Sequence, residues 1–304
     1  MKALVIGYGS IGSRHARLLQ NMGFPVKVVS GRQIDDYNPY KTIAEALADY
    51  APDYVVITNE TGRHYNSLAA LAECSYRGLV LVEKPLFDRQ RDLPENEFEG
   101  LYVGYNLRFH PVIQKLRDIV ADEKVLSFHV YVGQYLPGWR PNTDYRHTYS
   151  ASKALGGGVL RDLSHELDYT NWLLDGWRSL TALGGHYSHL ETDSDDIFSI
   201  LATTRKCPVV TIQLNYLDRH YRREILFNTD KHTIKADFIN ATLTIDDRSE
   251  NYNITRDFTY IAQHKAVTGR DAVSTCPATG GVEVLKMIEA AEKAVQSKGW
   301  VFND

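Results

Sequence analysis

Three glycines near the start of the chain form the spacing G-x-G-x-x-G over residues 7–12. The motif follows a short apolar run, residues 3–6, and opens a predicted helix over residues 10–22. In this context the first glycine permits a tight turn, the second lets the backbone approach a pyrophosphate, and the third allows close packing of helix on strand. We therefore expect a dinucleotide on the N–H groups of the helix start, although glycine-rich turns also occur for structural reasons. The residues concerned are Gly7, Gly9, Ser10, Ile11 and Gly12.

The end of the second predicted strand, residues 26–29, bears on which dinucleotide binds. An acidic residue there would hydrogen bond the ribose 2′-hydroxyl of NAD and repel a 2′-phosphate. Ser30 and Arg32 instead offer a hydroxyl and a guanidinium, which suit a phosphate. We expect NADP as cofactor. NAD is the alternative, in which Arg32 is a solvated loop residue and Asp35 or Asp36 binds the ribose.

Three further stretches carry groups that could take part in catalysis. They are Glu83-Lys84-Pro85, residues 104–111 (Gly-Tyr-Asn-Leu-Arg-Phe-His-Pro) and residues 156–168, in which three glycines precede Val-Leu-Arg-Asp-Leu-Ser-His-Glu-Leu-Asp. In this order and spacing, and with the glycine turn, they resemble the motifs of the glucose–fructose oxidoreductase/inositol dehydrogenase/rhizopine catabolism (Gfo/Idh/MocA) family. The resemblance runs almost end to end. It implies an NAD(P)-dependent oxidoreductase that transfers hydride between nicotinamide and a secondary alcohol or ketone of a sugar.

The resemblance makes Lys84 the general acid and base. Oxidation of an alcohol needs a group that removes the hydroxyl proton, and the reverse reaction needs the same group as acid. A nearby positive nicotinamide and desolvation would both lower the pKa of this lysine toward useful values. The resemblance also implies that Pro85 follows a cis bond. The alternative interpretation is a surface lysine at a strand end.

Asp162 and His165 are the second candidate pair. The sequence predicts one helix from about Val159 to Leu174, on which residues three apart share a face. By resemblance, His165 would hydrogen bond the reacting hydroxyl and Asp162 would orient the substrate or Lys84. Many members of the family separate this aspartate and histidine by four positions rather than three, which weakens the assignment of Asp162 more than that of His165.

The resemblance assigns further residues around the cofactor. Asn106 and Arg108 match the pattern G-Y-N-x-R. Asn106 is expected near the nicotinamide or the lysine, whereas Arg108 either binds substrate or pairs with an internal carboxylate. The loop after the third predicted strand resembles the family's cofactor-lining loop, although a histidine at a helix start could also be a capping or packing residue. The cofactor-lining residues expected here are Asn59, Thr61, His64 and Glu83.

Residues 134–146 mix aromatic rings with arginines, amides and acids. Sugar rings stack on aromatic side chains, and arginine binds carboxylate or phosphate bidentately. We therefore expect an anionic substrate such as a nucleotide-sugar, a uronic acid or a sialic-acid-like compound. The alternative is an interface or interdomain loop. The candidate substrate-binding residues are Lys84, Arg108, Tyr135, Trp139, Arg140, Tyr145, Asp162 and His165.

Two other functions remain open. Some relatives are glycosidases that oxidise the sugar transiently and reduce it again, and a non-catalytic NAD(P)-binding sensor is also possible. The acidic residues 191–196, with His186 and His189 upstream, superficially suggest a metal. A solvated turn is the better interpretation because hydride transfer of this kind needs no metal, and we expect none.

The order of the predicted elements indicates two domains. Short apolar strands alternate with helices up to about residue 120, which is typical of a parallel Rossmann sheet covered on both faces. Residues 121–304 predict an α+β domain with a large, mostly antiparallel open sheet for substrate binding and oligomerisation, and the final helix could pack back on the first domain. A sheet with one uncovered face favours a homodimer or homotetramer.

Composition sets limits on partners and location. A net charge of −4 gives no reason to expect nucleic acid or an anionic membrane as partner. The start of the chain lacks a signal-peptide pattern, and no run approaches the roughly 20 apolar residues of a membrane span. Three scattered cysteines favour neither zinc nor disulfides. We expect a cytoplasmic protein.

Overall fold

The computed structural model describes residues 1–304 except 36, 140–142, 272 and 304. The chain divides into two compact units. The first comprises Met1–Arg108 and Asp257–Val282, and the second comprises Phe109–Arg256 and Glu283–Asp304. This division differs from the expected boundary near residue 120 in two ways. Residues 109–120 belong to the second unit, and residues 257–282, late in the chain, belong to the first.

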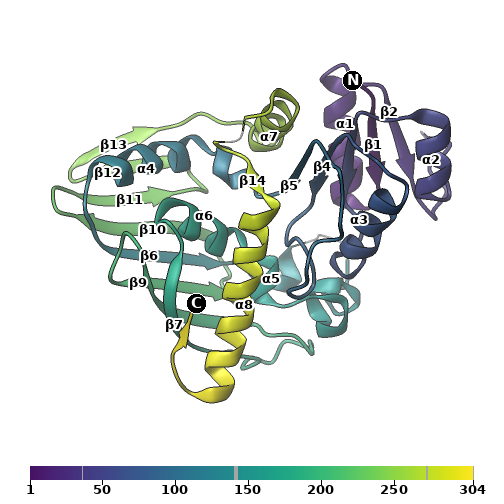
Figure 1. Cartoon of the computed structure of the whole chain (residues 1–304). Helices are drawn as coiled ribbons and strands as arrows, with labels where there is room; N and C mark the ends of the chain where they lie inside the picture. The colour runs from purple at the N-terminus through teal and green to yellow at the C-terminus, as the bar shows by residue number, and fades with distance from the viewer. Residues whose placement is uncertain (36, 140–142, 272, 304) are drawn as a thin grey trace. The chain divides into compact units, whose positions relative to one another are not determined.

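Within the described residues, the first unit builds a six-stranded sheet in the order β14-β5-β4-β3-β1-β2 (Figure 1). Strands β1 to β5 pair in parallel, and β14 joins antiparallel to β5. Every residue of β1, β3 and β4 is buried, as expected for a parallel sheet covered on both faces. The strands are β1 (Ala3–Ile6), β2 (Val26–Val29), β3 (Tyr54–Ile57), β4 (Leu79–Val82), β5 (Gly100–Val103) and β14 (Cys276–Pro277).

Helices cover this sheet, and a late one completes the core. Val267 packs with Val5, Leu19 and Leu81 in one buried cluster, although it lies far from them in the sequence. Local signals also set helix ends: Thr42 and Glu45 form a capping box at the start of α2. The helices of this unit are α1 (Ser10–Asn21), α2 (Ile43–Tyr50), α3 (His64–Glu73) and α7 (Phe258–Gly269), and short 3₁₀ turns cover Thr61–Arg63 and Asn106–Phe109.

The second unit is built on a sheet that has nine strands among the described residues, in the order β13-β12-β11-β10-β6-β9-β8-β7-β15. All pairings are antiparallel except that of β6 with β9. The strands are β6 (Val125–Gly133), β7 (Trp177–Gly185), β8 (Ile197–Thr204), β9 (Val210–Asn215), β10 (Arg222–Thr229), β11 (Thr233–Asp237), β12 (Thr242–Ile245), β13 (Arg248–Asn251) and β15 (Val301–Phe302).

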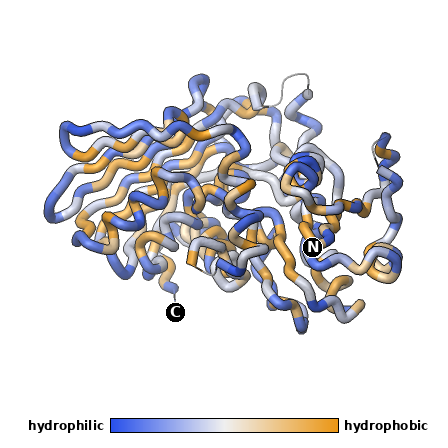
Figure 2. The backbone as a smooth tube through the Cα atoms, turned by 90° about the horizontal axis from the view of Figure 1, so that it is seen from above, coloured by the Kyte–Doolittle hydropathy of each residue, from blue (hydrophilic) through white to orange (hydrophobic). Residues whose placement is uncertain are grey.

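Hydropathy alternates along these strands (Figure 2), and one face of the sheet is covered by helices (Figure 1). The covered face is apolar and buried, with Val130, Ile200, Ile212 and Phe227 among its residues. The helices are α4 (Pro111–Asp122), α5 (Val159–Asp162), α6 (His165–Leu173) and α8, whose range Ala278–Ser297 begins in the first unit. The expected fold class, a Rossmann domain with an α+β domain built on a large, mostly antiparallel sheet, is therefore confirmed.

The single helix expected over residues 159–174 is wrong. It is interrupted at Leu163 and Ser164, which separate α5 from α6. Aspartate and serine favour helix starts because their side chains compete for backbone hydrogen bonds. The sequence Asp162-Leu163-Ser164 carries both residues in three positions.

Among the described residues, no helix combines the length and the apolar composition that crossing a bilayer requires.

His110 makes the stability of the second unit sensitive to acid. Its side chain is the N-cap of α4, and Nδ1 accepts from the N–H of Val112 over 3.2 Å. Burial and then the charge of Arg223 lower the pKa of His110 to about 4. A lowered histidine pKa means that stability is fully present above the unfolded value near 6.5 and is lost as pH falls toward 4.

We predict that His110 alone removes about 2 kcal/mol of unfolding free energy between pH 7.5 and pH 5. Urea unfolding at both pH values measures this loss. The control is His110→Asn, which keeps an N-cap acceptor and cannot titrate. The variant should lose less stability than the wild type by that amount, and equal losses in both proteins would contradict the prediction.

Candidate active site

The glycine turn between β1 and α1 leaves no room for side chains at two positions. Gly7 has φ +94°, and an added Cβ would lie 2.6 Å from the backbone nitrogen of Asn59. At Gly12 an added Cβ would lie 2.2 Å from the carbonyl oxygen of Gly7 and 2.6 Å from Oγ1 of Thr58. The Thr58 hydroxyl donates to the same Gly7 carbonyl over 2.9 Å. Helix α1 therefore starts directly against the ends of β1 and β3.

Gly9 differs, because an added Cβ would meet no described atom within 4 Å. It is the N-cap of α1, and its helix start has no side-chain cap among the described residues. The first N–H groups of a helix, here including those of Ser10 and Ile11, have no acceptor within the helix. Open space before an uncapped N-terminus fits the pyrophosphate of a dinucleotide.

The turn after β2 lies beside the glycine turn, since the N–H of Gly7 donates to the carbonyl of Val29 over 2.9 Å. Ser30 is buried, and its Oγ accepts from the N–H of Arg32 over 3.1 Å. Arg32 and Asp35 are exposed, and Asp36 lies outside the described residues. The serine hydroxyl thus shapes the turn and keeps its own proton for donation.

The loop after β3 is tied to the loop after β4 through His64, which is buried. Its Nε2 lies 3.0 Å from the carbonyl oxygen of Asn59, and its Nδ1 lies 3.0 Å from that of Pro85. Burial lowers the pKa of His64, although the surrounding carbonyl groups act in the opposite direction. Thr61 is buried in the 3₁₀ turn between these contacts. His64 therefore joins the loops after β3 and β4.

Lys84 follows β4, and its bond to Pro85 is cis, as the resemblance implies. The preceding Glu83 is buried. One carboxylate oxygen, Oε2, accepts from the N–H of Lys84 over 3.1 Å, and the other, Oε1, lies 2.9 Å from Nε2 of His15. Burial by itself raises the pKa of Glu83, but His15 and Lys84 lower it, and the net pKa is below its ordinary value. Glu83 is thus held as an anion at the base of the Lys84 loop.

Asn106 and Arg108 of the G-Y-N-x-R pattern both hydrogen bond to a later segment of the first unit. Asn106 is buried and donates through Nδ2 to Oγ1 of Thr259 over 2.7 Å. Arg108 is buried and donates through Nη1 to the carbonyl of Thr275 over 3.1 Å. Both contacts fix the late segment that carries α7 and β14 to the end of β5.

In the second unit, Asp162 and His165 lie on two different helices. The expectation that they share one helical face is therefore wrong, because the break at residues 163–164 lies between them. Asp162 is buried, and its Oδ2 accepts from the hydroxyl of Tyr216 over 2.6 Å. His165 is half-buried at the start of α6. Burial and the nearby Asp162 raise the pKa of Tyr216, so its hydroxyl stays a donor to that carboxylate.

The acidic run before β8 shapes the backbone. Asp195 accepts from the N–H of Leu160 at the start of α5 over 3.0 Å. Asp196 accepts from the N–H of Tyr187 over 3.0 Å and from the hydroxyl of Ser188 over 2.6 Å. Among the described residues, no three His, Cys, Asp or Glu side chains are grouped so that they could hold a metal ion.

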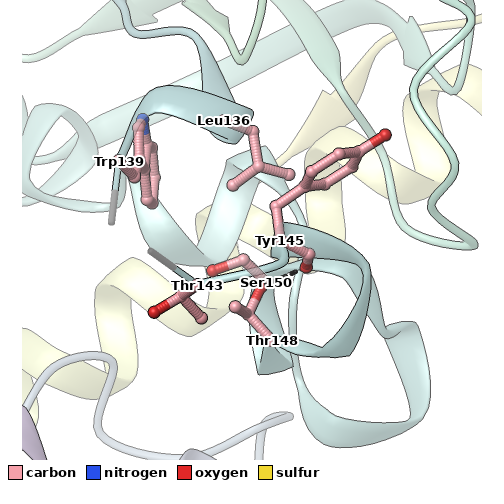
Figure 3. Close-up of a pocket in the computed structure, with 6 residues that line it drawn as sticks. All are labelled: Leu136, Trp139, Thr143, Tyr145, Thr148 and Ser150. Atoms are coloured by element: carbon pink, nitrogen blue, oxygen red, sulfur yellow. Dashed lines mark hydrogen bonds between the residues drawn. The ribbon is translucent and has the colours of Figure 1, made fainter. Parts of the chain in front are cut away.

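The loop after β6 forms a small pocket in the second unit (Figure 3). Its volume of about 10 Å³ holds about one water molecule or hydroxyl group. Ser150 is buried there, and neither its Oγ nor Nε1 of Trp139 has a hydrogen-bond partner among the described residues. The lining residues are Leu136, Trp139, Thr143, Tyr145, Thr148 and Ser150.

The other expected substrate residues of this loop have different surroundings. The guanidinium of Arg219 covers one face of the Tyr135 ring, 3.4 Å from its centroid. The hydroxyl of Tyr145 accepts from the N–H of Glu191 over 3.1 Å. Arg146 is paired with Asp144. Arg140 lies outside the described residues.

The sequence interpretation missed two residues that fix candidate side chains, one in each unit. No motif near His15 predicts its contact with Glu83. Tyr216 lies just past the end of β9, and no residue near it predicts its contact with Asp162. The glycine spacing gave the position of α1, on which His15 lies. No local pattern could have predicted contacts between residues so far apart in the chain.

Comparison with known proteins identifies the chain's relatives. Residues 113–235 match the family model described as the GFO/IDH/MocA C-terminal domain. An inositol 2-dehydrogenase of Salmonella paratyphi B is 26% identical over 198 residues, which are 58% of this chain and 55% of that protein. The chain thus spans about half the length of the curated relatives it matches. Residues 113–235 of the chain are thus similar to the C-terminal domain of the Gfo/Idh/MocA family.

Solved structures share the fold of this chain over its full length. GenD2 from gentamicin A biosynthesis, in complex with NAD, superposes with a TM-score of 0.80 at 20% identity and covers 100% of this chain and 96% of its own. The WlbA dehydrogenase from Bordetella pertussis, in complex with NADH and UDP-GlcNAcA, gives 0.79 at 15% identity and covers 100% and 99%.

The surroundings of two glycines in the turn between β1 and α1 predict different effects of alanine. Gly9→Ala should keep the melting temperature of the wild type, because its Cβ enters open space and its φ of −86° suits any residue. The same Cβ would obstruct the approach of a pyrophosphate, so the Kd for NADPH should rise about tenfold or more. Thermal unfolding and fluorescence titration measure the two effects.

Gly12→Ala is the matched comparison. Its Cβ collides with backbone atoms, and overpacking of this kind costs about 1–3 kcal/mol or more. This variant should lose stability before any effect on binding can be measured. Unaltered NADPH binding by Gly9→Ala would contradict the assignment of the turn as a pyrophosphate site.

Proposed function

We propose that this protein is an NAD(P)-dependent oxidoreductase that transfers hydride between a nicotinamide cofactor and a secondary alcohol or ketone of a sugar. The observation that carries the proposal is the edge shared by the glycine turn and Lys84. Strands β1 and β4 are parallel members of one sheet. The glycine turn begins at Gly7, directly after the carboxyl end of β1, and Lys84 lies just after the carboxyl end of β4. Ligands of open α/β sheets bind at this edge.

The residues around the glycine turn fit a dinucleotide. Gly9 leaves open space before the uncapped start of α1, which supports pyrophosphate binding there. The bound nicotinamide would supply the hydride acceptor or donor. We place Asn59, Thr61, His64, Glu83 and Asn106 along the same site because they lie on the loops that follow β3, β4 and β5.

We propose NADP as the preferred cofactor. Ser30 and Arg32 form the turn after β2, with the serine hydroxyl able to donate and the guanidinium exposed. A hydroxyl and a guanidinium are donors that complement a 2′-phosphate. The exposed Asp35 on the same segment is the group that would favour NAD instead.

Lys84 is the proposed general acid and base of the reaction. Its backbone N–H donates to Glu83 just after the carboxyl end of β4. Asp162 and His165 are the proposed catalytic partners from the second unit. Tyr216 helps to orient the Asp162 carboxylate by donating to Oδ2.

The proposed substrate is a sugar derivative that carries an anionic group. The pocket of Figure 3 offers the indole of Trp139 and the unpartnered hydroxyl of Ser150, which suit a sugar hydroxyl. Arg140 is the proposed partner of the anionic group, since Arg146 is already paired within the loop. The complex of WlbA with UDP-GlcNAcA supports the substrate class by analogy.

We also propose that the uncovered face of the large sheet binds a second copy of the chain. Register places Leu183, Leu201 and Leu226 on this face, where they are 78%, 41% and 45% exposed. An exposed apolar surface between polar residues is typical of a protein interface. This arrangement would give a homodimer or, through further contacts, a homotetramer.

Replacement of the proposed base tests the function. Lys84→Met should lower kcat by about 10²- to 10⁴-fold, because that is the usual contribution of a general acid or base. The Kd for NADPH should stay close to that of the wild type. The assay follows nicotinamide absorbance with a panel of uronic acids and nucleotide-sugars. Lys41→Met, a change at an exposed lysine elsewhere in the first unit, is the control and should retain full turnover.

The same panel separates this function from the alternatives. Cleavage of a glycoside without net change in nicotinamide absorbance would indicate the glycosidase chemistry of some relatives. Full turnover by Lys84→Met would contradict the assigned role of the lysine.

The cofactor preference has its own test. Arg32→Ala should raise the Kd for NADPH by about 10- to 100-fold, since a charged hydrogen bond contributes about 1.5–3 kcal/mol. The Kd for NADH should be unaffected because that cofactor has no 2′-phosphate. Lys27→Ala is the control for the change in net charge, because it removes an exposed cation that lies on β2 rather than in the turn. Equal losses for both cofactors would contradict the proposed phosphate contact.

A further inference from the structure

Four buried polar side chains of the first unit form a continuous row of hydrogen bonds. The hydroxyl of Tyr54 lies 2.9 Å from Nδ1 of His264, and Nε2 of His264 lies 2.8 Å from Nδ1 of His15. Nε2 of His15 lies 2.9 Å from Oε1 of Glu83. The relative exposures of Tyr54, His264 and His15 are each 0%, and that of Glu83 is 7%.

The row has one consistent direction. The Glu83 carboxylate can only accept, so Nε2 of His15 must donate to it. A neutral His15 then has an unprotonated Nδ1, which accepts from Nε2–H of His264. A neutral His264 in turn accepts at Nδ1 from the Tyr54 hydroxyl. Every link therefore has one donor and one acceptor, and every donor is directed toward Glu83.

The surroundings of the other three residues favour the protonation states that this direction needs. Burial lowers the pKa of His264 well below its ordinary value, which keeps that imidazole neutral. Burial raises the pKa of Tyr54, which keeps its hydroxyl proton in place. The pKa of Glu83 is lowered, which keeps it a carboxylate.

The row ends at the proposed catalytic lysine. Oε1 of Glu83 accepts from His15. The other carboxylate oxygen, Oε2, accepts from the backbone N–H of Lys84 over 3.1 Å. Gly104 leaves space for this carboxylate, because an added Cβ there would lie 2.9 Å from Oε1. The orientation of Glu83 is thus set on both sides.

We infer that Tyr54, His264 and His15 are positioning residues that orient the Glu83 carboxylate and, through it, the backbone of Lys84. This inference rests on the proposed function only in that Lys84 is taken as the general acid and base. The row of hydrogen bonds itself can be observed without turnover. None of the three residues is placed to touch substrate. They act through Glu83.

The test compares His264→Leu with His264→Gln. Leucine removes the donor to Nδ1 of His15, so the His15 ring loses one of the two contacts that fix its orientation against Glu83, whereas glutamine retains an N–H donor near the position of Nε2. Tyr54→Phe is the third variant and removes only the hydroxyl at the far end. Thermal unfolding of each variant establishes that it is folded.

The first measurement is ¹⁵N NMR of the histidine rings and of the Lys84 amide in the full chain at pH 7. The wild type should show the Nε2–H tautomer for both His15 and His264, and a downfield Lys84 amide proton. His264→Leu should shift the amide proton upfield, and His264→Gln should restore it. An Nδ1–H tautomer at His264, or an amide shift that ignores both substitutions, would overturn the inference whether or not the protein turns over a sugar.

The second measurement is steady-state kinetics with any sugar that the wild type oxidises. His264→Leu should lower kcat by about 10- to 100-fold with little change in the KM for NADPH, because misplacement of a reacting group affects the chemical step. His264→Gln should recover most of this loss. Normal kcat in folded His264→Leu would overturn the link to Lys84. A wild type with no turnover on the whole panel would instead count against the proposed function.

Discussion

The approach of helix α1 to the ends of β1 and β3 is a contact in which backbone meets backbone without intervening side chains. A single methyl group at Gly12 would lie 2.2 Å from the carbonyl of Gly7, and Thr58 donates its hydroxyl to that same carbonyl. The start of α1 can therefore lie at the carboxyl edge of the parallel sheet, with its free N–H groups directed outward. The same helix carries His15 to Glu83, so the glycine packing also sets the base of the Lys84 loop.

The first unit fixes its polar residues by using each for more than one contact. His64 joins the loops after β3 and β4, Glu83 accepts from both His15 and Lys84, and Arg108 fastens the segment that returns from residue 257. Buried polar groups are costly unless they are paired, so such shared contacts restrict the loops to one arrangement. The second unit uses the same principle where Tyr216 donates to Asp162. Rigid loops are what a hydride transfer needs, because the reacting groups must be held within a narrow range of distances.

Strands β1, β3 and β4 of the first unit are predictable from sequence because each is a short, buried apolar run bounded by glycine or polar residues. Helix α7 is not, since its buried positions include Thr259, Gln263 and His264 and show no apolar stripe. The break in the helix after Asp162 is also missed, because Leu160, Leu163 and Leu167 continue a helical spacing across it. The cofactor turn and Lys84 could be located by motif, whereas the row from Tyr54 to Glu83 depends on a pairing between residues 15 and 264, for which no neighbouring residue gives a signal.

The measurement that tests the central claim most directly is a fluorescence titration of the full-length protein with NADPH and with NADH, followed by the sugar panel read at the nicotinamide absorbance band. The account predicts saturable binding, tighter for NADPH, and turnover of at least one anionic sugar. Tighter binding of NADH would preserve the oxidoreductase and reverse the cofactor preference. Failure to bind either dinucleotide would mean that the glycine turn is only structural, and it would contradict the account as a whole.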